Sequence, residues 1–369
     1  MLLIGLMSGT SLDGVDAVLA QFASPIPALL GKYHLPYPAD LKQQLFQLQY
    51  PTDNELHLSQ LTALQLSECY AQAVHALLTK TGYRPTDIAA IGCHGQTIRH
   101  RPDCGYTLQI GNAALLAELT GMDVIHDFRS RDIAAGGQGA PLVPAFHAAL
   151  FTHEDISRII VNIGGISNLT YLPHPTDTPL QRQMVSGFDC GPGNVLMDFW
   201  VHRHLGHSYD HQGQWAACGQ LIPELLSALL TEPFFQLPPP KSTGRDLFNP
   251  DWLAHYLQQD QYYELADIQA TLLALTTHSI AKAIHKYPDA QEVYLCGGGA
   301  YNTALYAQLE TQLPLHTLST TAALGIAPDE VEALAFAWLA YQTLRHQPAN
   351  LPTVTGASGL RILGSTTFA

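Results

Sequence analysis

The chain opens with two apolar runs separated by a polar turn. Residues 2–7 are apolar, and residues 15–20 are apolar apart from Asp16. Between them, residues 8–14 are mostly glycines, hydroxyl side chains and one carboxylate. This pattern predicts a β-hairpin with a polar loop. Glycines let backbone N–H groups approach an anion, and a carboxylate can hold a metal ion or its water, so the loop suits a metal-bound phosphate. An ordinary polar turn between two core strands fits the same pattern.

Predicted strands and helices alternate along the rest of the chain, which indicates an α/β protein. The clearest helix is 55–79, where leucines and a valine form a broad apolar stripe that ends at Gly82. The predicted helices are 41–48, 55–79, 113–120, 141–151, 221–230, 268–287 and 328–345. The predicted strands are 2–7, 15–20, 88–93, 106–110, 124–125, 158–163, 166–172 and 292–299.

Two patterns of the first half recur in the second half. The strand, glycine turn and strand at 158–172 repeat the opening hairpin, and the strand that ends at glycine in 88–95 is repeated in 292–299. A duplicated domain explains both repeats. We therefore expect an N-terminal lobe of residues 1–140, with 347–369 packing back on it, and a C-terminal lobe of residues 141–346.

Length and charge restrict the class of protein. A chain of 369 residues exceeds what one hydrophobic core usually serves, and 47% hydrophobic against 13% charged residues indicates a well-buried globular protein. The net charge of −14 and the lack of a basic run argue against nucleic acid or an anionic membrane as partner. The six cysteines form no CxxC pair, and neither a signal peptide nor a membrane span is visible. We expect a cytoplasmic protein.

Several common nucleotide and hydrolase motifs are absent from the sequence, namely GxxxxGK[ST], GxGxxG, GxSxG and HExxH. The sequence instead has four glycine-bearing polar turns at strand ends, at 8–14, 94–97, 164–168 and 297–299. Ligands of open α/β sheets gather beyond the carboxyl ends of strands, so four such turns favour a phosphate-binding cleft. The histidines at 202, 204, 207 and 211 lack the spacing of a helical metal site, and we expect a structural or exposed role for them.

Two further segments are candidates for chemistry. Asp189 lies between Phe188 and Cys190 in a segment of glycines and a proline (187–198), which we interpret as a rigid turn leading into a helix. A carboxylate held beside apolar neighbours is a candidate general base, although an aspartate that caps a helix fits the same pattern. Arg129, Arg131 and Asp132 form either an anion-binding group or a surface ion-pair patch.

Eight blocks together resemble anhydro-N-acetylmuramic acid kinase, nearly from end to end. They are MSGTSLDGVD (7–16), GCHGQTIRHRP (92–102), QIGNAALLAELTG (109–121), DFRSRDIAAGGQGAPLVPAFH (127–147), NIGGISN (162–168), GFDCGPGNVLMD (187–198), PKSTGR (240–245) and CGGGAYN (296–302). The resemblance implies two RNase H-like lobes of the actin/Hsp70/hexokinase type around a central nucleotide cleft. It also implies a bacterial cell-wall recycling enzyme that uses ATP, Mg²⁺ and water. Such an enzyme opens the 1,6-anhydro ring of its sugar and phosphorylates O6, giving N-acetylmuramic acid 6-phosphate and ADP.

The resemblance also assigns residues. It implies that Asp189 is the catalytic base and that the first loop holds the ATP phosphates, with Asp13 and Asp16 near the metal through water. The implied nucleotide-binding residues are Gly9, Thr10, Ser11, Leu12, Asp13, Gly14, Val15, Asp16, Gly164, Gly165, Gly297, Gly298 and Gly299. The implied sugar-pocket residues are His94, Gln96, Arg131 and Glu332.

The resemblance further implies a homodimer, for which the segments 141–151 and 268–287 are candidate surfaces.

Two alternative functions stay open at this point. One is a plain kinase of a related amino sugar with a free anomeric hydroxyl. The other is a non-enzymatic, ATP-gated binding or filament protein, because the same fold serves chaperones and cytoskeletal proteins.

Overall fold

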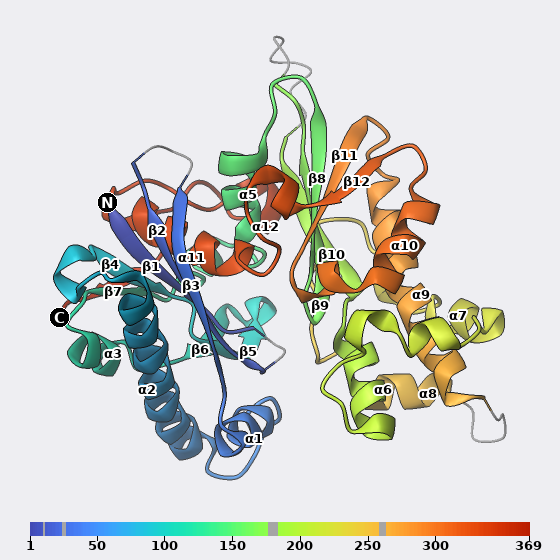
Figure 1. Ribbon diagram of the computed structural model, residues 1–369, viewed down its shortest axis with the longest axis horizontal. Helices are drawn as coiled ribbons and strands as arrows, with labels where there is room; N and C mark the ends of the chain where they lie inside the picture. The colour runs from blue at the N-terminus through green and yellow to red at the C-terminus, as the bar shows by residue number, and fades with distance from the viewer. Residues whose placement is uncertain (10–11, 24–26, 176–183, 258–262) are drawn as a thin grey trace. The chain divides into compact units, whose positions relative to one another are not determined.

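A computed structural model describes residues 1–9, 12–23, 27–175, 184–257 and 263–369. The chain forms two compact units, Met1–Leu150 with Glu330–Ala369, and Phe151–Asp329 (Figure 1). From the sequence we expect the boundaries between the two lobes to follow residues 140 and 346, whereas the boundaries between the two units follow residues 150 and 329. The difference arises because helix α11 (Val331–Leu344) packs against strands β1 and β4 of the first unit.

The first unit is built on a six-stranded sheet in the order β13-β7-β4-β1-β2-β3. Its strands are β1 (Leu2–Met7), β2 (Gly14–Gln21), β3 (Ala28–Pro36), β4 (Ala90–Cys93), β7 (Val124–His126) and β13 (Ser365–Thr367). Strands β1, β2 and β3 form an antiparallel meander, whereas β4 and β7 continue the sheet in parallel with β1. The predicted opening hairpin is therefore confirmed. A separate hairpin consists of β5 (Gln96–Arg101) and β6 (Tyr106–Ile110).

The two longest helices of the first unit cover opposite faces of this sheet. Ile4 and Leu6 of β1 share a core cluster with Leu66 and Leu77 of α2 (Glu55–Thr81). Gly5 points to the other face, because side chains alternate along a strand, and there it meets the backbone of α11. The remaining helices of this unit are α1 (Ala39–Gln47), α3 (Ala113–Thr120), α4 (Ser130–Ile133), α5 (Val143–Phe151) at the boundary, and α12 (Pro352–Thr355).

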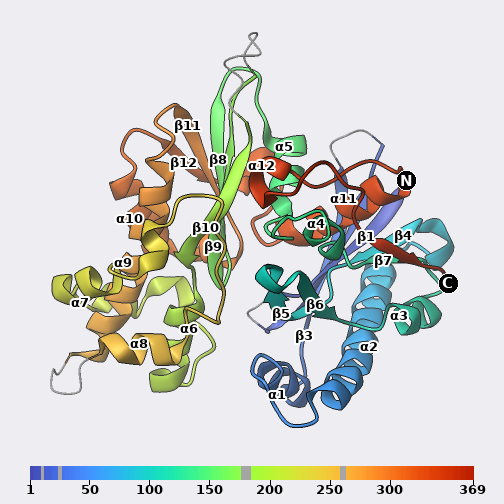
Figure 2. The ribbon, with the colours of Figure 1, turned by 180° about the vertical axis from the view of Figure 1, so that it is seen from behind.

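The second unit is built on a five-stranded sheet in the order β10-β9-β8-β11-β12 (Figure 2). Its strands are β8 (Ser157–Ile163), β9 (Ile166–Leu172), β10 (Ser186–Pro192), β11 (Ala290–Cys296) and β12 (Thr317–Thr320). Its helices are α6 (Val195–Leu205), α7 (Pro223–Leu229), α8 (Pro250–Tyr256), α9 (Leu265–Ile284) and α10 (Thr303–Gln312). Helix α9 has 15 of its 20 residues buried and contributes Ile268, Leu272 and Leu275 to the core.

Both sheets repeat one topology. In each, an antiparallel meander of three strands is followed by two strands parallel to the first, which gives the order 3-2-1-4-5 for β1, β2, β3, β4, β7 and for β8, β9, β10, β11, β12. The predicted repeats therefore occupy equivalent places, since β1 corresponds to β8 and β4 to β11. The α/β class and the two RNase H-like lobes are confirmed.

One predicted element is wrong. The first part of the segment 187–198, interpreted as a turn, is instead the edge strand β10, antiparallel to β9, whereas the helix expected after it is confirmed as α6. Phe188 and Cys190 are 1% and 2% exposed, and their alternate positions drive this segment into an extended strand despite its glycines. Within the described residues, no helix has the length and apolar character needed to cross a membrane.

Candidate functional site

The first glycine loop is anchored to the second. Ser8 is buried, and its hydroxyl donates to the carbonyl of Gly95 at 2.9 Å and contacts the hydroxyl of Tyr70 at 2.6 Å. The carbonyl of Gly9 accepts a hydrogen bond from Gln96 Nε2 at 3.0 Å. The polar turns at 8–14 and 94–97 therefore meet at the ends of the adjacent parallel strands β1 and β4. Thr10 and Ser11 lie outside the described residues.

Three of the predicted phosphate-loop residues also shape the hairpin itself. Leu12 and Val15 are buried, and Leu12 has a φ of 57°. A Cβ on Gly14 would lie 2.4 Å from the carbonyl oxygen of Leu35, so only glycine fits between β2 and β3 there. These three residues therefore present backbone, rather than polar side chains, to any ligand of the loop.

The two carboxylates of the first loop differ in their surroundings. Asp13 is exposed, and its carbonyl accepts the backbone N–H of Tyr37 at 3.1 Å. Asp16 lies opposite His34 in the β2–β3 pair, and its Oδ1 is 2.8 Å from His34 Nδ1. The side chains of this pair are each 46% exposed, so the contact is a surface one.

His94 links the first loop to Arg129. Arg129 Nη2 donates to His94 Nε2 at 2.9 Å, and the other ring nitrogen, Nδ1, is 3.2 Å from the carbonyl oxygen of Ser8. Because arginine can only donate, Nε2 is the acceptor and Nδ1 carries the proton. Burial, and next the charge of Arg129, lower the pKa of His94 to about 3. His94 is therefore a neutral ring that bridges Arg129 and the carbonyl oxygen of Ser8.

The other predicted sugar-pocket residues have different environments. Gln96 is 1% exposed, and its Oε1 is buried without a hydrogen-bond partner in the described chain. Arg131 is exposed on α4, where its guanidinium has no partner among the described residues. Glu332 is half-buried in the first turn of α11. Of the four, Gln96 is thus the one with a buried polar atom that has no hydrogen-bond partner among the described residues.

The surroundings of Asp132 exclude this residue from the surface ion-pair patch that was one of the two interpretations of Arg129, Arg131 and Asp132. It is fully buried, and its Oδ1 accepts hydrogen bonds from Asn350 at 2.7 Å and from Thr355 at 2.8 Å. Its Oδ2 accepts the backbone N–H of Gly139 at 2.9 Å. Asp132 therefore ties the C-terminal segment to the first unit and is not part of a surface patch.

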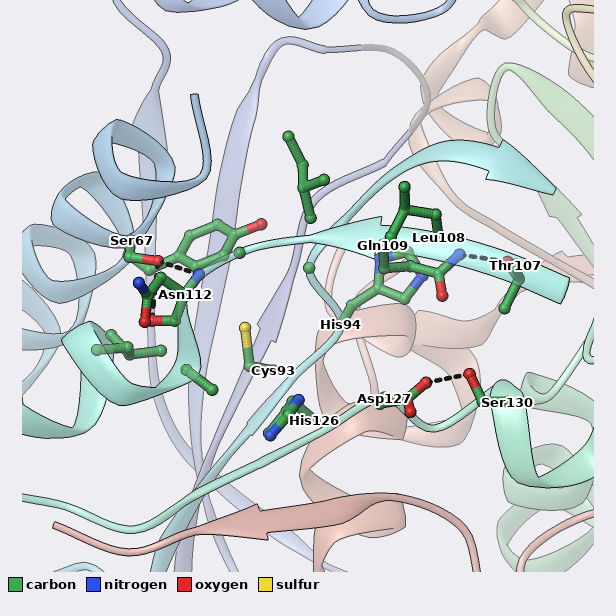
Figure 3. Close-up of a pocket in the computed structure, with 16 residues that line it drawn as sticks. Ser67, Cys93, His94, Thr107, Leu108, Gln109, Asn112, His126, Asp127 and Ser130 are labelled. Carbon is green, nitrogen blue, oxygen red and sulfur yellow. Dashed lines mark hydrogen bonds between the residues drawn. The ribbon is translucent and has the colours of Figure 1, made fainter. Parts of the chain in front are cut away.

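A cavity of about 180 Å³ lies beside His94 in the first unit (Figure 3). Its polar lining includes Thr107, Gln109, Asp127 and Ser130. Figure 3 shows the hydrogen bonds from Gln109 Nε2 to Thr107 and from Ser130 to Asp127, so these groups are held in place by one another. Of the predicted sugar-pocket residues, only His94 lines this cavity.

The third and fourth glycine turns meet in the second unit. The turn at Gly164 and Gly165 joins β8 to β9, and a Cβ on Gly299 would lie 2.3 Å from Ile163 Cγ2, at the end of β8. Gly297 has a φ of 77°, and a Cβ there would lie 2.4 Å from Asn162 Oδ1. A Cβ on Gly298, by contrast, would have no neighbouring heavy atom within 4 Å. The two turns therefore lie together at the ends of the adjacent parallel strands β8 and β11.

The turn at Gly164 and Gly165 is also packed on the start of α6. The carbonyl of Gly164 accepts the N–H of Asn194 at 2.8 Å, and the carbonyl of Gly165 accepts the N–H of Gly193 at 2.9 Å. A Cβ on Gly193 would lie 2.3 Å from the carbonyl oxygen of Gly164, so the approach requires glycine at 193. The backbone of this turn is thereby fixed in position.

Asp189 is held by the loop at 238–249. Its Oδ2 accepts the backbone N–H of Thr243 at 2.8 Å, and its own N–H donates to the carbonyl of Lys241 at 3.1 Å. Its side chain is half-buried and points away from the core face, which carries the side chains of Phe188 and Cys190. The sequence identified this carboxylate, but not the loop that orients it.

The described residues contain no group of three or more His, Cys, Asp and Glu side chains placed to hold a metal ion. Magnesium, however, usually needs only one or two carboxylates besides waters and substrate phosphates. An exposed Asp13 and a half-exposed Asp16 beside a glycine loop fit that requirement.

Of the histidines at 202, 204, 207 and 211, His204 packs on Trp200 with ring centroids 4.1 Å apart, which agrees with the structural role expected for it.

Comparison with known proteins assigns the family. The family model described as anhydro-N-acetylmuramic acid kinase matches residues 1–369. The protein of that name from Nitrosospira multiformis is 55% identical, over 98% of this chain and 97% of its own length. That from Nitrosomonas europaea is 54% identical, over 98% of each chain.

Among solved structures, component A of (R)-2-hydroxyglutaryl-CoA dehydratase from Acidaminococcus fermentans is 11% identical, with a TM-score of 0.49. The match covers 94% of this chain and 99% of that one. The family model and the curated relatives agree with the eight sequence blocks. This chain belongs to the anhydro-N-acetylmuramic acid kinase family.

Proposed function

We propose that the chain carries out its family's reaction with ATP, water and 1,6-anhydro-N-acetylmuramic acid. Water attacks C1 of the sugar while Asp189 accepts a proton from it. The C1–O6 bond breaks, O6 bonds to the γ-phosphorus, and the bond from that phosphorus to the β-γ bridging oxygen breaks. The products are N-acetylmuramic acid 6-phosphate and ADP. The observation that carries this proposal is the carboxylate of Asp189, which the Thr243 N–H holds on a rigid strand.

One well-placed carboxylate is sufficient for this chemistry. An inverting glycosidase uses a base to activate water on one face and an acid to protonate the departing oxygen on the other. Here the departing O6 is captured by the γ-phosphoryl group, so no second carboxylic acid is required. Phosphoryl transfer itself depends mainly on positioning and on neutralising charge.

The glycine turns supply the positioning. We assign the ATP phosphates to the loop from Gly9 to Asp16 and to the turn of Gly164 and Gly165, and the adenosine to Gly297, Gly298 and Gly299. Two features support this assignment: the backbone of each turn is fixed by hydrogen bonds or close packing, and the space at Gly298 is open. A bound Mg²⁺ would neutralise phosphate charge. We assign Asp13 and Asp16 to its water shell.

The sugar pocket is assigned to His94, Gln96, Arg131 and Glu332, with separate roles. The buried, unpartnered Oε1 of Gln96 would accept a hydrogen bond from a sugar hydroxyl or amide. His94 would act as a positioning residue, because both of its ring nitrogens are already engaged in hydrogen bonds.

We further propose that the protein is a cytoplasmic homodimer, as the family resemblance implies.

Replacing Gln96 with leucine is expected to raise the KM for the sugar about tenfold, which corresponds to the loss of one hydrogen bond to a polar ligand group. The KM for ATP should also rise, but by less, because the variant loses the hydrogen bond from Gln96 Nε2 to the Gly9 carbonyl of the phosphate loop. Steady-state kinetics with each substrate varied in turn measures both values. Gln49→Leu is the matched control, since the side chain of Gln49 donates to the backbone carbonyls of Leu45 and Thr97 and to no other group among the described residues. A raised KM for ATP with an unchanged KM for the sugar would assign Gln96 to the nucleotide instead.

The ring-opening step is tested by running the reaction in ¹⁸O-labelled water. One labelled oxygen is expected at C1 of the product and none in the phosphate ester, as mass spectrometry of product and fragments would show. Unlabelled product kept in labelled water for the same time corrects for exchange at C1. A side-by-side assay with N-acetylmuramic acid tests the plain-kinase alternative, which requires faster turnover of the open sugar.

A further inference from the structure

Three lysines meet at a small hollow on the core face of strand β10, in the second unit. The hollow is lined by Lys241 from the loop at 238–249, by Lys282 from α9 and by Lys286 from the turn that follows α9. Its floor consists mainly of Phe188, Cys190, Phe235 and Ser279. The chain has only six lysines, at 32, 42, 80, 241, 282 and 286, in a protein of net charge −14. Half of them therefore surround one site.

The carboxylate that acts on these lysines lies outside the hollow: the charge of Asp189 raises the pKa of Lys241, but by less than burial and the charge of Lys286 lower it. None of the three forms an ion pair within the described part of the chain, and the lining contains no carboxylate. Burial raises the pKa of the Cys190 thiol, so this side chain is neutral as well. Lys241 Nζ donates to the carbonyl of Phe234 at 3.0 Å and lies 4.2 Å from the centroid of the Phe234 ring, which leaves further N–H groups available.

The lysines are close enough to repel one another. Desolvation first, and then the charge of Lys286, lower the pKa of Lys241 to about 8. A lysine near the C-terminus of a helix interacts favourably with its dipole, which accounts for Lys282 and Lys286 at the end of α9. It does not account for Lys241, which belongs to another segment. The convergence of all three is explained if an anion relieves their repulsion.

We propose that this lysine hollow binds a tetrahedral oxyanion, either inorganic phosphate or the terminal group of a phosphomonoester. The hollow measures only about 20 Å³, little more than one water molecule needs. It therefore seats only one edge of such a group, whose remaining oxygens would extend into solvent beside the exposed Lys282 and Lys286, and it does not enclose a whole metabolite. Lysine ammonium groups bind phosphate oxygens as point charges with several donors each. The site lies on the opposite side of β10 from the side chain of Asp189, so an anion in the hollow would not contact that carboxylate, although the carbonyl of Lys241 accepts the Asp189 N–H.

The six lysines make a direct test possible. Selective ¹³Cε-lysine labelling gives one NMR signal for each lysine, assigned by single Lys→Gln variants. Inorganic phosphate and glucose 6-phosphate are titrated separately at constant ionic strength, with chloride as the compensating anion. We expect the signals of Lys241, Lys282 and Lys286 to shift with one shared dissociation constant, while those of the other lysines stay in place. The tighter of the two probes identifies the ion or the ester as the ligand.

The variant Lys282→Gln/Lys286→Gln is expected to weaken phosphate binding at Lys241 about a hundredfold, at about tenfold for each charge-assisted hydrogen bond lost. Lys42→Gln/Lys80→Gln removes two exposed lysines of the first unit and should leave the affinity unchanged. Equal shifts of all six signals, or shifts produced equally by chloride, would show general screening and overturn the proposal. No step of the test depends on kinase activity, so its outcome is independent of the proposed function.

Discussion

Replacing Asp189 with asparagine is expected to lower kcat by about 10²–10⁴-fold, the usual contribution of a positioned general base. Asparagine has the same shape, and its side-chain oxygen can still accept the Thr243 N–H that now binds Asp189 Oδ2 at 2.8 Å. The loop at 238–249 should therefore stay in place. What the variant loses is the ability to accept a proton from water. Product formation measured by mass spectrometry gives kcat, and calorimetric titration gives the affinity for ATP, which should change less than twofold.

Asp267→Asn is the matched control for this experiment. Asp267 also lies in the second unit, and its Oδ1 accepts a backbone N–H, that of Gln220, at 2.7 Å. This variant makes the same chemical change in a similar local environment, and its kcat should stay within about twofold of the original. If Asp189→Asn retained more than a tenth of the original kcat, the assignment of Asp189 as the base would be wrong. A parallel loss of ATP affinity would instead indicate a nucleotide-binding role.

Replacing Gly5 with alanine is expected to destabilise the first unit by about 3 kcal/mol or more, at the upper end of what overpacking costs. A Cβ at Gly5 would lie 1.9 Å from the carbonyl oxygen of Ala333, in the backbone of α11. Gly5 pairs with Gly92 in the neighbouring strand, where a Cβ would lie 2.2 Å from the carbonyl oxygen of Phe336. The two glycines thus form a flat patch on which α11 rests directly. Since helix backbone and not a side chain is in the way, no rotamer change relieves the clash.

Thermal unfolding followed by circular dichroism tests this expectation. The Tm should fall by about 6–12 °C, at roughly 2–4 °C for each kcal/mol in a unit of this size. Gly92→Ala should have a similar effect, because it disturbs the same contact. Gly359→Ala is the control: its nearest neighbour is the end of the Arg361 side chain at 3.2 Å, which can move away, so its Tm should change little. A Gly5→Ala protein as stable as this control would show that α11 does not rest on the patch.

The prediction of local structure from sequence succeeded where the signal is periodic and local. The stripe in α2, the cap at Gly82 and the continuous apolar runs of β1 and β8 all lie within a few residues of the features they predict. The prediction failed at β10, where glycines and a proline are typical of a turn. There, pairing with β9 and the burial of Phe188 and Cys190 override local propensity. Strand β3 was missed because it is a partly exposed edge strand without a strong apolar pattern.

The sequence by itself determined the α/β class, the duplicated strand pattern, the family resemblance and the identity of most candidate residues, since these depend on residue type and short spacing. Only the tertiary structure decided how those residues are held. It joined His94 to Ser8 and Arg129, buried Asp132 under the C-terminal segment, oriented Asp189 through Thr243 and brought Lys241 to the end of α9. Each of these contacts joins groups 35 to 218 residues apart. The packing of whole helices and strands sets such contacts, and no local sequence pattern encodes them.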